Sequence, residues 1–437
     1  MMRGHSPLFP MHAAIALLIL TLTYIGMAAG RIAWLRVDRT GIALLAVIAL
    51  LASGEMTLDD FGSAVSLSTL ALLFAMMIIS AQFAESGFID LCARTITGTR
   101  GGTTALLALT VAIGGALSAV LANDILIIAI APLLVAGAQR RGLDPRPFVI
   151  ALAAATNAGS AATLIGNPQN ILLGAIGRLG FWHFLAINGL PALFALVSVF
   201  AVVWLQWSRR MRQPAVEPIG SGHAAAPVLA HPIDRFQMIK AGVALLVLLI
   251  LFSTPLPRET GALIIAALLL ANRRITSRTM IATVDWPLLL LVACLFAITG
   301  TLNATGIAAG LLAFLSDSGL LPNNLAVLLP FALVTSNAIG SVPAAMLLLQ
   351  IWPLPPDSVL YSLALLSSLA GNLLLSGSLS TLLVAESAAA MGAPVSFRDY
   401  ARAGVPITVI SLAFASFWLV VTGILPLTPP PVPPPLP

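Results

Sequence analysis

Residues 162–170 read Ala-Thr-Leu-Ile-Gly-Asn-Pro-Gln-Asn, in the middle of a long apolar segment. The flanking residues suit a helix, but Gly166 lowers helix stability and Pro168 lacks the backbone donor that a helix interior needs. We therefore expect a helix over about 148–178 that is broken between the glycine and the proline. Broken backbone at membrane depth is costly unless it lines a cavity or is buried in protein, so the break predicts a binding site.

The composition around this break is that of a membrane protein. Of the 437 residues, 59% are hydrophobic and 8% are charged, and the mean hydropathy is +1.03. These values predict an all-α polytopic membrane protein that contacts the lipid bilayer. The net charge of +5 comes from arginines between apolar runs, so it predicts membrane topology and no nucleic-acid partner.

Several chemistries find no support in the sequence. Cys92 and Cys294 are too few and too far apart for a disulfide framework or a soft-metal site. The five histidines lie near span ends or in a linker, which argues against a zinc site and a Ser-His dyad. There is no G-x-x-x-x-G-K-[ST] loop and no H-E-x-x-H helix. We therefore expect no enzyme, no cofactor and no metal, beyond a bound sodium ion or proton coupling.

The polar and glycine residues that interrupt or bound the apolar runs of the first half recur in the second half at an offset of about 220 residues. In the first half, Asn123 and Asn157 interrupt apolar runs 34 residues apart; in the second, Asn337 and Asn372 do so 35 residues apart. Thr40-Gly41 and Thr260-Gly261 open corresponding runs, and Ser86-Gly87 and Thr305-Gly306 end another pair. The matching positions predict an internal repeat.

The stretches before and after Asn123 either both cross the membrane or form a re-entrant hairpin. The hairpin arrangement puts eighteen arginines and lysines on one face and leaves only Arg3, Arg178 and Arg258 on the other. Crossing arms would remove most of this bias, so the positive-inside rule favours hairpins. Each half then has about five transmembrane helices plus one hairpin, and an odd number of crossings inverts one half relative to the other.

These arguments give a domain plan for the chain. The first inverted repeat covers 1–208, with a hairpin at about 103–138 and a broken helix at about 148–178. A cytoplasmic linker covers 209–237. The second repeat covers 238–425, with a hairpin at about 322–350 and a broken helix at about 358–387, and a proline-rich tail covers 426–437.

We expect a multi-pass protein of a plasma membrane, the bacterial inner membrane, with both termini outside. The segment Met11–Ala29 could be a signal peptide, but it is long enough to span, and arginines follow it. It is therefore expected to be a retained first helix.

The breaks and hairpin tips supply the candidate substrate-binding residues, because unwound helices expose carbonyls and half-helix N-termini that suit ions. Since no arginine or lysine falls centrally in a predicted span, an anion would be held by helix N-termini and amides. The candidates are Asn123, Asn157, Ser160, Thr163, Gly166, Asn167, Asn170, Ser336, Asn337, Asn372 and Ser378.

Two carboxylates are candidates for the coupling-ion site. Asp124 follows Asn123 at a predicted hairpin tip, and an intramembrane carboxylate is by default a functional candidate. Glu386 lies at the far end of the second broken span and could equally be interfacial.

The motif Asn157-x-Gly159-Ser160 through Asn170, preceded by Asn123-Asp124, resembles the ion transporter superfamily. That superfamily includes citrate-transporter-like proteins, divalent anion:sodium symporters, ArsB-type arsenite permeases and NhaD-type sodium/proton antiporters. Ser336-Asn337 and Gly371-Asn372 resemble its second-half signatures, so the resemblance covers about 40–425.

The resemblance implies substrate binding at the hairpin tips, sodium coordination by nearby carbonyls, elevator motion and a possible homodimer. The tips Ala122-Asn123-Asp124 and Ser336-Asn337-Ala338 both depart from the Ser-Asn-Thr of the divalent anion symporters. We therefore expect a secondary active transporter of a small anionic solute, such as a citrate-like carboxylate or arsenite, coupled to protons or sodium. The alternative is a sodium/proton antiporter, and a remote one is a membrane enzyme or scaffold.

Overall fold

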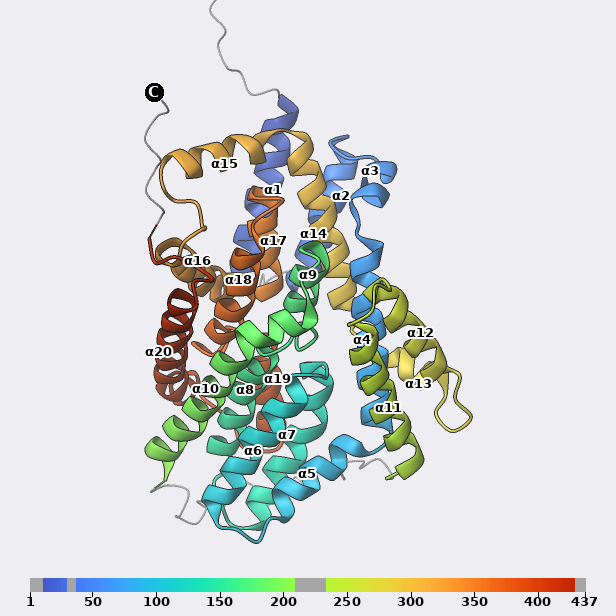
Figure 1. Ribbon diagram of the computed structural model, residues 1–437, viewed down its shortest axis with the longest axis vertical. Coiled ribbons are helices and arrows are strands. Elements are labelled where there is room, and N and C mark those ends of the chain that lie inside the picture. The colour runs from blue at the N-terminus through green and yellow to red at the C-terminus, as the bar shows by residue number, and fades with distance from the viewer. Residues whose placement is uncertain (1–10, 30–36, 209–232, 429–437) are drawn as a thin grey trace, which may run out of the picture.

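The computed structural model describes residues 11–29, 37–208 and 233–428, which fold into helices joined by short connections. The predicted all-α class is confirmed (Figure 1). The described helices of the first half are α1 (Met11–Ala29), α2 (Arg39–Ala52), α3 (Leu58–Ala64), α4 (Leu67–Glu85), α5 (Phe88–Gly98), α6 (Thr103–Ser118), α7 (Asn123–Arg140), α8 (Arg146–Ser160), α9 (Pro168–Ile176) and α10 (Phe181–Trp207).

The second half contains the same succession of long and short helices. Its members are α11 (Arg235–Leu251), α12 (Arg258–Leu270), α13 (Ser277–Ala282), α14 (Trp286–Ala304), α15 (Ile307–Asp317), α16 (Leu325–Ala338), α17 (Ser341–Ile351), α18 (Asp357–Ala370), α19 (Leu379–Ala390) and α20 (Phe397–Val421). Equivalent turns recur: Gly87 before α5 and Gly306 before α15 both adopt positive φ, at 77° and 74°.

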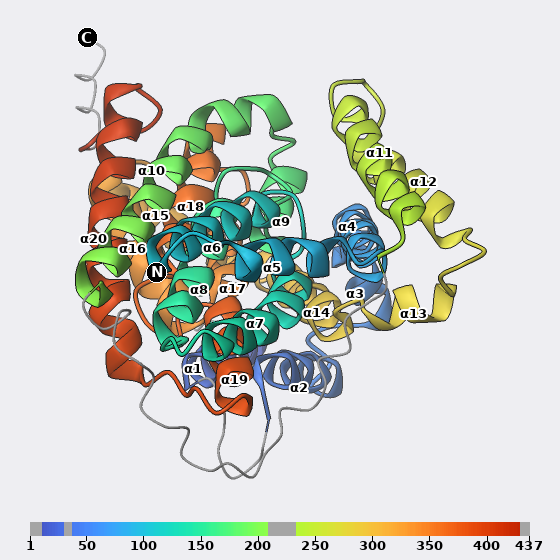
Figure 2. The same cartoon turned by 90° about the horizontal axis from the view of Figure 1, so that it is seen from below.

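Each half packs its helices into the other half in the same way. Helix α2 packs on α14, and its counterpart α12 packs on α4. Helix α7 packs on α19, and its counterpart α17 packs on α9. Helices α10 and α20, which are themselves counterparts, lie side by side at one edge in both views (Figures 1 and 2). The contacts between halves therefore follow the repeat, while the orientation of the two halves in the membrane stays a prediction.

Within the residues that the structure describes, five helices are long and apolar enough to cross a membrane unaided: α4, α7, α10, α14 and α20. The two interrupted segments do not reach that length, because each is divided into two short helices. Residues 161–167 separate α8 from α9, and residues 371–378 separate α18 from α19. The four pieces lie in the middle of the molecule (Figure 1). Residues 147–160 of α8 and 359–370 of α18 are buried throughout, as expected for helices that are apolar on every side.

Small residues allow α8 to approach α6 at backbone distance. A methyl group on Gly159 would lie 2.1 Å from the carbonyl oxygen of Gly115. One on Gly114 would lie 3.0 Å from the side chain of Leu152. Close approach through small residues is the usual way in which membrane helices pack. The first hairpin is thereby fixed against the helix that carries Asn157.

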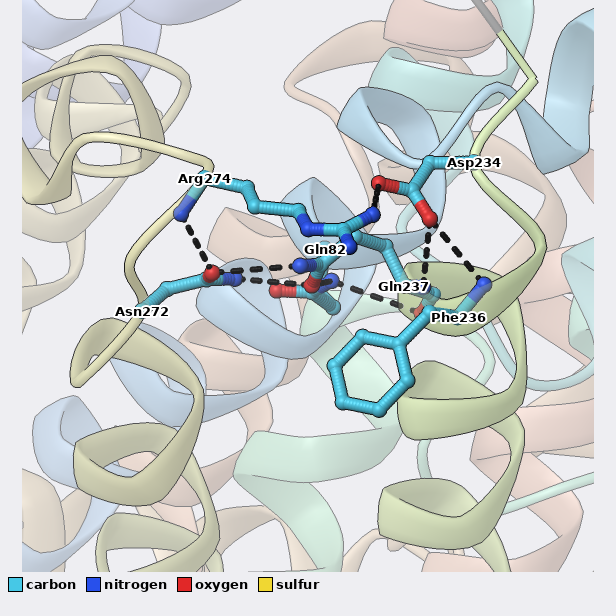
Figure 3. Close-up of polar contacts among 6 residues, drawn as sticks. All are labelled: Gln82, Asp234, Phe236, Gln237, Asn272 and Arg274. Atoms are coloured by element: carbon cyan, nitrogen blue, oxygen red, sulfur yellow. Dashed lines mark hydrogen bonds and ion pairs between the residues drawn. The ribbon is translucent and has the colours of Figure 1, made fainter.

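A separate set of amides joins α4 to α11 and to the end of α12 (Figure 3). Gln82 donates to Gln237 Oε1 at 3.0 Å, and Gln237 exchanges two hydrogen bonds with Asn272, at 3.2 and 2.8 Å. Arg274 forms an ion pair with Asp234 at 2.7 Å. These contacts lie at the edge opposite α10 and α20 (Figure 2), so they hold that edge together without involving the helix breaks.

Two predicted boundaries differ from the structure. Helix α11 begins at Arg235, inside the predicted linker of 209–237, because Asp234 caps it by accepting from Phe236 N and Gln237 N. Most of that linker lies outside the described residues. The predicted tail begins with Pro426, whose carbonyl oxygen accepts from Leu325 N at 2.8 Å; residues 429–437 lie outside the described part of the chain.

Candidate substrate-binding site

The two helix breaks meet at Asn157. Its Nδ2 donates to Asn372 Oδ1 at 2.9 Å and contacts Ser378 Oγ at 3.0 Å. Asn372 in turn donates to the carbonyl oxygen of Ala154 at 3.2 Å. Asn157, Asn372 and Ser378 were all candidates from the sequence, and the fold brings them together although they come from different halves. We call these three residues the crossing, because the two interrupted helices meet there.

The first break is held open by Asn167 and Asn170. Asn167 caps α9 by accepting from Asn170 N at 2.8 Å, and its Nδ2 donates to Ser368 Oγ at 3.0 Å. Asn170 Nδ2 donates to the carbonyl oxygens of Ser160 and Thr163, at 3.0 and 2.9 Å. The amides thus replace the backbone hydrogen bonds that the helix loses. Gly166 is required here, since a methyl group on it would lie 2.3 Å from the Ser160 carbonyl oxygen.

The first hairpin tip contacts the first break. Residues 119–122 form the turn, so Asn123 and Asp124 open α7 instead of occupying the tip itself. Ser118 Oγ donates to Asn123 Oδ1 and to the Thr156 carbonyl oxygen. Asp124 lies in the first turn of α7, next to Asn123. Asp285, at the start of α14, is close enough for its charge to act on Asp124.

Thr163 and Ser160 have local roles in the same region. Thr163 Oγ1 donates to the carbonyl oxygen of Ala119 in the hairpin turn. Ser160 Oγ contacts Asn167 Nδ2 at 3.3 Å and donates to the Asn157 carbonyl oxygen at 3.1 Å. Both side chains therefore connect the break to its neighbours by internal hydrogen bonds.

The second hairpin tip contacts the second break. Asn337 lies in the last turn of α16 and donates to the carbonyl oxygens of Leu333 and Ala370, both at 2.9 Å. A methyl group on Gly377 would lie 2.5 Å from Asn337 Oδ1. The turn that follows Asn337 contains Gly340 at φ 98°, a backbone conformation that L side chains rarely adopt.

Four buried side-chain oxygens at the site have no hydrogen-bond partner among the described residues. They are Gln169 Oε1, Asn170 Oδ1, Ser336 Oγ and Asn337 Oδ1. Buried polar atoms are almost always paired, so unpaired ones at a helix break mark places where a ligand could bond. Helices α7 and α17 also begin without a side-chain cap. The site therefore offers oxygens that suit a cation or a donor, and free helix N-termini that suit an anion.

Glu386 lies apart from this region. It is on the exposed side of α19, about 12 Å along the helix from Ser378 at 1.5 Å per residue. Ser378 and Thr381, by contrast, form the capping box at the start of that helix. The structure thus places Asp124 in the first turn of α7, after the first hairpin turn, and Glu386 at the surface of the chain.

Sequence reasoning missed Ser367 and Ser368, which bind the first break from the other half. Gln169 Nε2 contacts both hydroxyls, and Ser368 also accepts from Asn167. The signal was a pair of serines in an apolar helix, one turn before Gly371-Asn372. It also missed Asp285 and Arg39, which lie at helix starts.

The arrangement of helices is that of a known class of transporters. The chain superposes on the YdaH transporter of Alcanivorax borkumensis with a TM-score of 0.59 and 16% identity, over 96% of this chain and 99% of that one. The match to MtrF of Neisseria gonorrhoeae, described as an antimetabolite efflux pump, has a TM-score of 0.56 and 15% identity over 98% of both chains. At such identities the likeness establishes the fold.

The sequence gives the family. The profile of the citrate transporter family matches residues 15–354, and this chain belongs to that family. It is 27% identical to a 46 kDa membrane protein of Mycobacterium leprae over 93% of this chain and 98% of the relative. It is 30% identical to the silicon efflux transporter LSI3 of Oryza sativa over 38% of this chain and 34% of the relative. The protein is thus an integral membrane transporter, and not an enzyme, as the sequence predicted.

Proposed function

We propose that this chain is a secondary active transporter of a small anion, a citrate-like carboxylate or an oxyanion, driven by a proton or sodium gradient across a bacterial plasma membrane. The observation that carries the proposal is the crossing, where Asn157 of α8 bonds Asn372 and Ser378 of the opposite break. Discontinuous helices that meet between repeats are the usual substrate site of secondary transporters.

The buried position of the site supports an elevator mechanism. Asn157 is 5% exposed and Asn372 is 0% exposed, so a solute can reach them only if the hairpins or the helices around them move. The scaffold would be the reciprocal contacts α2–α14 and α12–α4, and the moving part would carry both breaks and both hairpins. Asp124, at the start of α7 beside the first break, is the group that would take up the coupling cation.

The test is uptake of labelled citrate by purified protein in liposomes under an imposed pH gradient, an imposed sodium gradient, or neither. We expect accumulation with one gradient and none without it. Asn157→Ala, which removes the centre of the crossing, should lower it at least tenfold. Equal uptake with and without gradients would show a passive pathway and contradict secondary active transport.

Sodium/proton exchange is the second candidate function, because Asp124 is an acidic group at the start of α7 and the charge of a second carboxylate, Asp285 at the start of α14, acts on it. An exchanger would acidify or alkalinise the liposome lumen when sodium is added with no organic solute present. A carrier would move protons only together with its solute.

A further inference from the structure

The second hairpin tip is contacted by a cation that the sequence analysis assigned only to membrane topology. Arg39 begins α2, and its Nη1 lies 3.0 Å from where a methyl group on Gly340 would be. Its Nε donates to the Met27 carbonyl oxygen over a long 3.5 Å. The guanidinium group therefore lies against the backbone of the tip, between α16 and α17.

Arg39 forms no ion pair within the described residues. The ion pairs found among the described residues are those of Arg146 with Asp144 and Asp399, and of Arg274 with Asp234. The preceding Asp38 uses its carboxylate to cap α2 through Gly41 N at 2.8 Å. A half-buried guanidinium without a counter-ion is costly, and an anion that binds beside it would remove that cost.

The tip adds uncharged donors beside this cation. Helix α17 begins at Ser341 with no side-chain cap, so the N–H groups of its first turn can bind an anion. Ser336, which is 0% exposed, lies two residues before the end of α16, and its hydroxyl has no hydrogen-bond partner in the described part of the chain. The tip is in turn in contact with the crossing: Asn337 touches Gly377, and Gly377 precedes Ser378.

We propose that Arg39 is a substrate-positioning residue, whose guanidinium binds the negatively charged group of the transported solute at the second hairpin tip. This inference rests on the proposed transport function and makes it more specific. A carboxylate, Asp124, follows the first hairpin tip in the first turn of α7, and the second tip faces a cation. The solute charge is therefore bound at the second tip and the coupling cation at the first.

The repeat supplies a matched control. Arg258 begins α12 as Arg39 begins α2, but its guanidinium is engaged by protein. Its Nη1 and Nη2 donate to the carbonyl oxygens of Gly174 and Arg178, both at 3.4 Å. Arg258 thus binds carbonyl oxygens at the C-terminal end of α9, so removing its charge tests position and not merely charge.

The experiment measures uptake into liposomes of citrate, succinate, phosphate, sulfate, and the uncharged silicic and arsenous acids at pH 7. We expect an anion to be taken up, and Arg39→Gln to raise its KM about tenfold or more, which corresponds to about 1.4 kcal/mol. The maximal rate should stay within about twofold. Arg39→Lys should give an intermediate KM, because lysine keeps the charge and loses the planar fork. Arg258→Gln should leave the KM unchanged.

Three results would overturn the assignment. One is uptake of the uncharged acids alone, which would leave transport intact and remove the need for a cation. Another is a fall in maximal rate at unchanged KM in Arg39→Gln, which would mean that Arg39 holds the hairpin tip in place and does not bind the solute. The third is an equal KM change in Arg258→Gln. Melting curves without solute identify any misfolded variant. If Arg39→Gln is misfolded, the KM of Arg39→Lys is compared with that of the wild type instead. Uptake of none of the solutes would contradict the transport function itself.

Discussion

Asn157 Nδ2 lies 2.9 Å from Asn372 Oδ1, although the two residues are 215 positions apart. Asn157 lies in the last turn of α8, just before the first break, and Asn372 lies within the second break, in the other half. The hydrogen bond therefore joins the two halves beside their helix breaks. A site built this way changes if either half moves alone.

Replacing Asn157 with alanine should remove its side-chain hydrogen bonds to Asn372 and Ser378 in the second half. Asn372 Oδ1 would be left buried without a partner, which costs about 1–3 kcal/mol. We expect transport to fall at least tenfold and the melting temperature to fall by several degrees. The control is Asn188→Ala on α10, which removes a similarly buried amide whose only hydrogen bond to a described residue, the one to the Tyr361 carbonyl oxygen, is long at 3.4 Å. Similar transport losses in both variants would show that burial, and not the crossing, is what matters.

Gly159→Ala should separate α6 from α8. The added methyl group would lie 2.1 Å from the Gly115 carbonyl oxygen, so the backbones must move apart at a cost of about 1–3 kcal/mol or more. Gly242→Ala on α11 is the matched control, because no atom lies within 4 Å of its methyl position. There alanine should stabilise the helix by up to about 1 kcal/mol. Thermal unfolding in detergent measures both, and an unaltered melting point for Gly159→Ala would contradict the close packing.

Asp124→Asn tests the coupling role. The amide keeps the shape of the side chain but can neither take up a proton nor neutralise a cation. We expect uptake to lose its response to the driving gradient, while counterflow of labelled against unlabelled solute continues. Asp59→Asn, on the exposed face of α3, should change neither activity. If gradient-driven uptake by Asp124→Asn matched the wild type, the coupling group would lie elsewhere.

The ion pair at the edge of the molecule predicts a pH dependence of stability. The hydrogen bond from Arg274 holds the pKa of Asp234 below its usual range. A lowered pKa in the folded state means that the carboxylate stabilises the fold above the unfolded pKa of about 4 and loses this effect as the pH falls further. Asp234→Asn should therefore lower the melting temperature slightly at pH 7 and hardly at all near pH 3. A difference that grew on acidification would have the wrong sign.

The sequence was sufficient where single residues determine the backbone. Gly166 and Pro168 identify the first break, and the repeat then locates the second, which has no proline. The sequence could not assign Ser368 or Arg39, because their roles depend on partners from the other half. Ser368 is 201 positions from Asn167, and no local pattern reports such a contact. Asn123 was expected at the hairpin tip and instead opens α7, because the turn is made by residues 119–122.

The exchange of helices between halves has a consequence for synthesis. At about 5–20 residues per second, the ribosome needs on the order of ten to forty seconds to pass from Asn157 to Asn372. During that time α4 lacks α12 and α8 lacks its amide partner. Until the second half is synthesised, the polar side chains of the first half, such as Asn157, lack their hydrogen-bond partners in the bilayer. Insertion factors or water must form hydrogen bonds with them during that time.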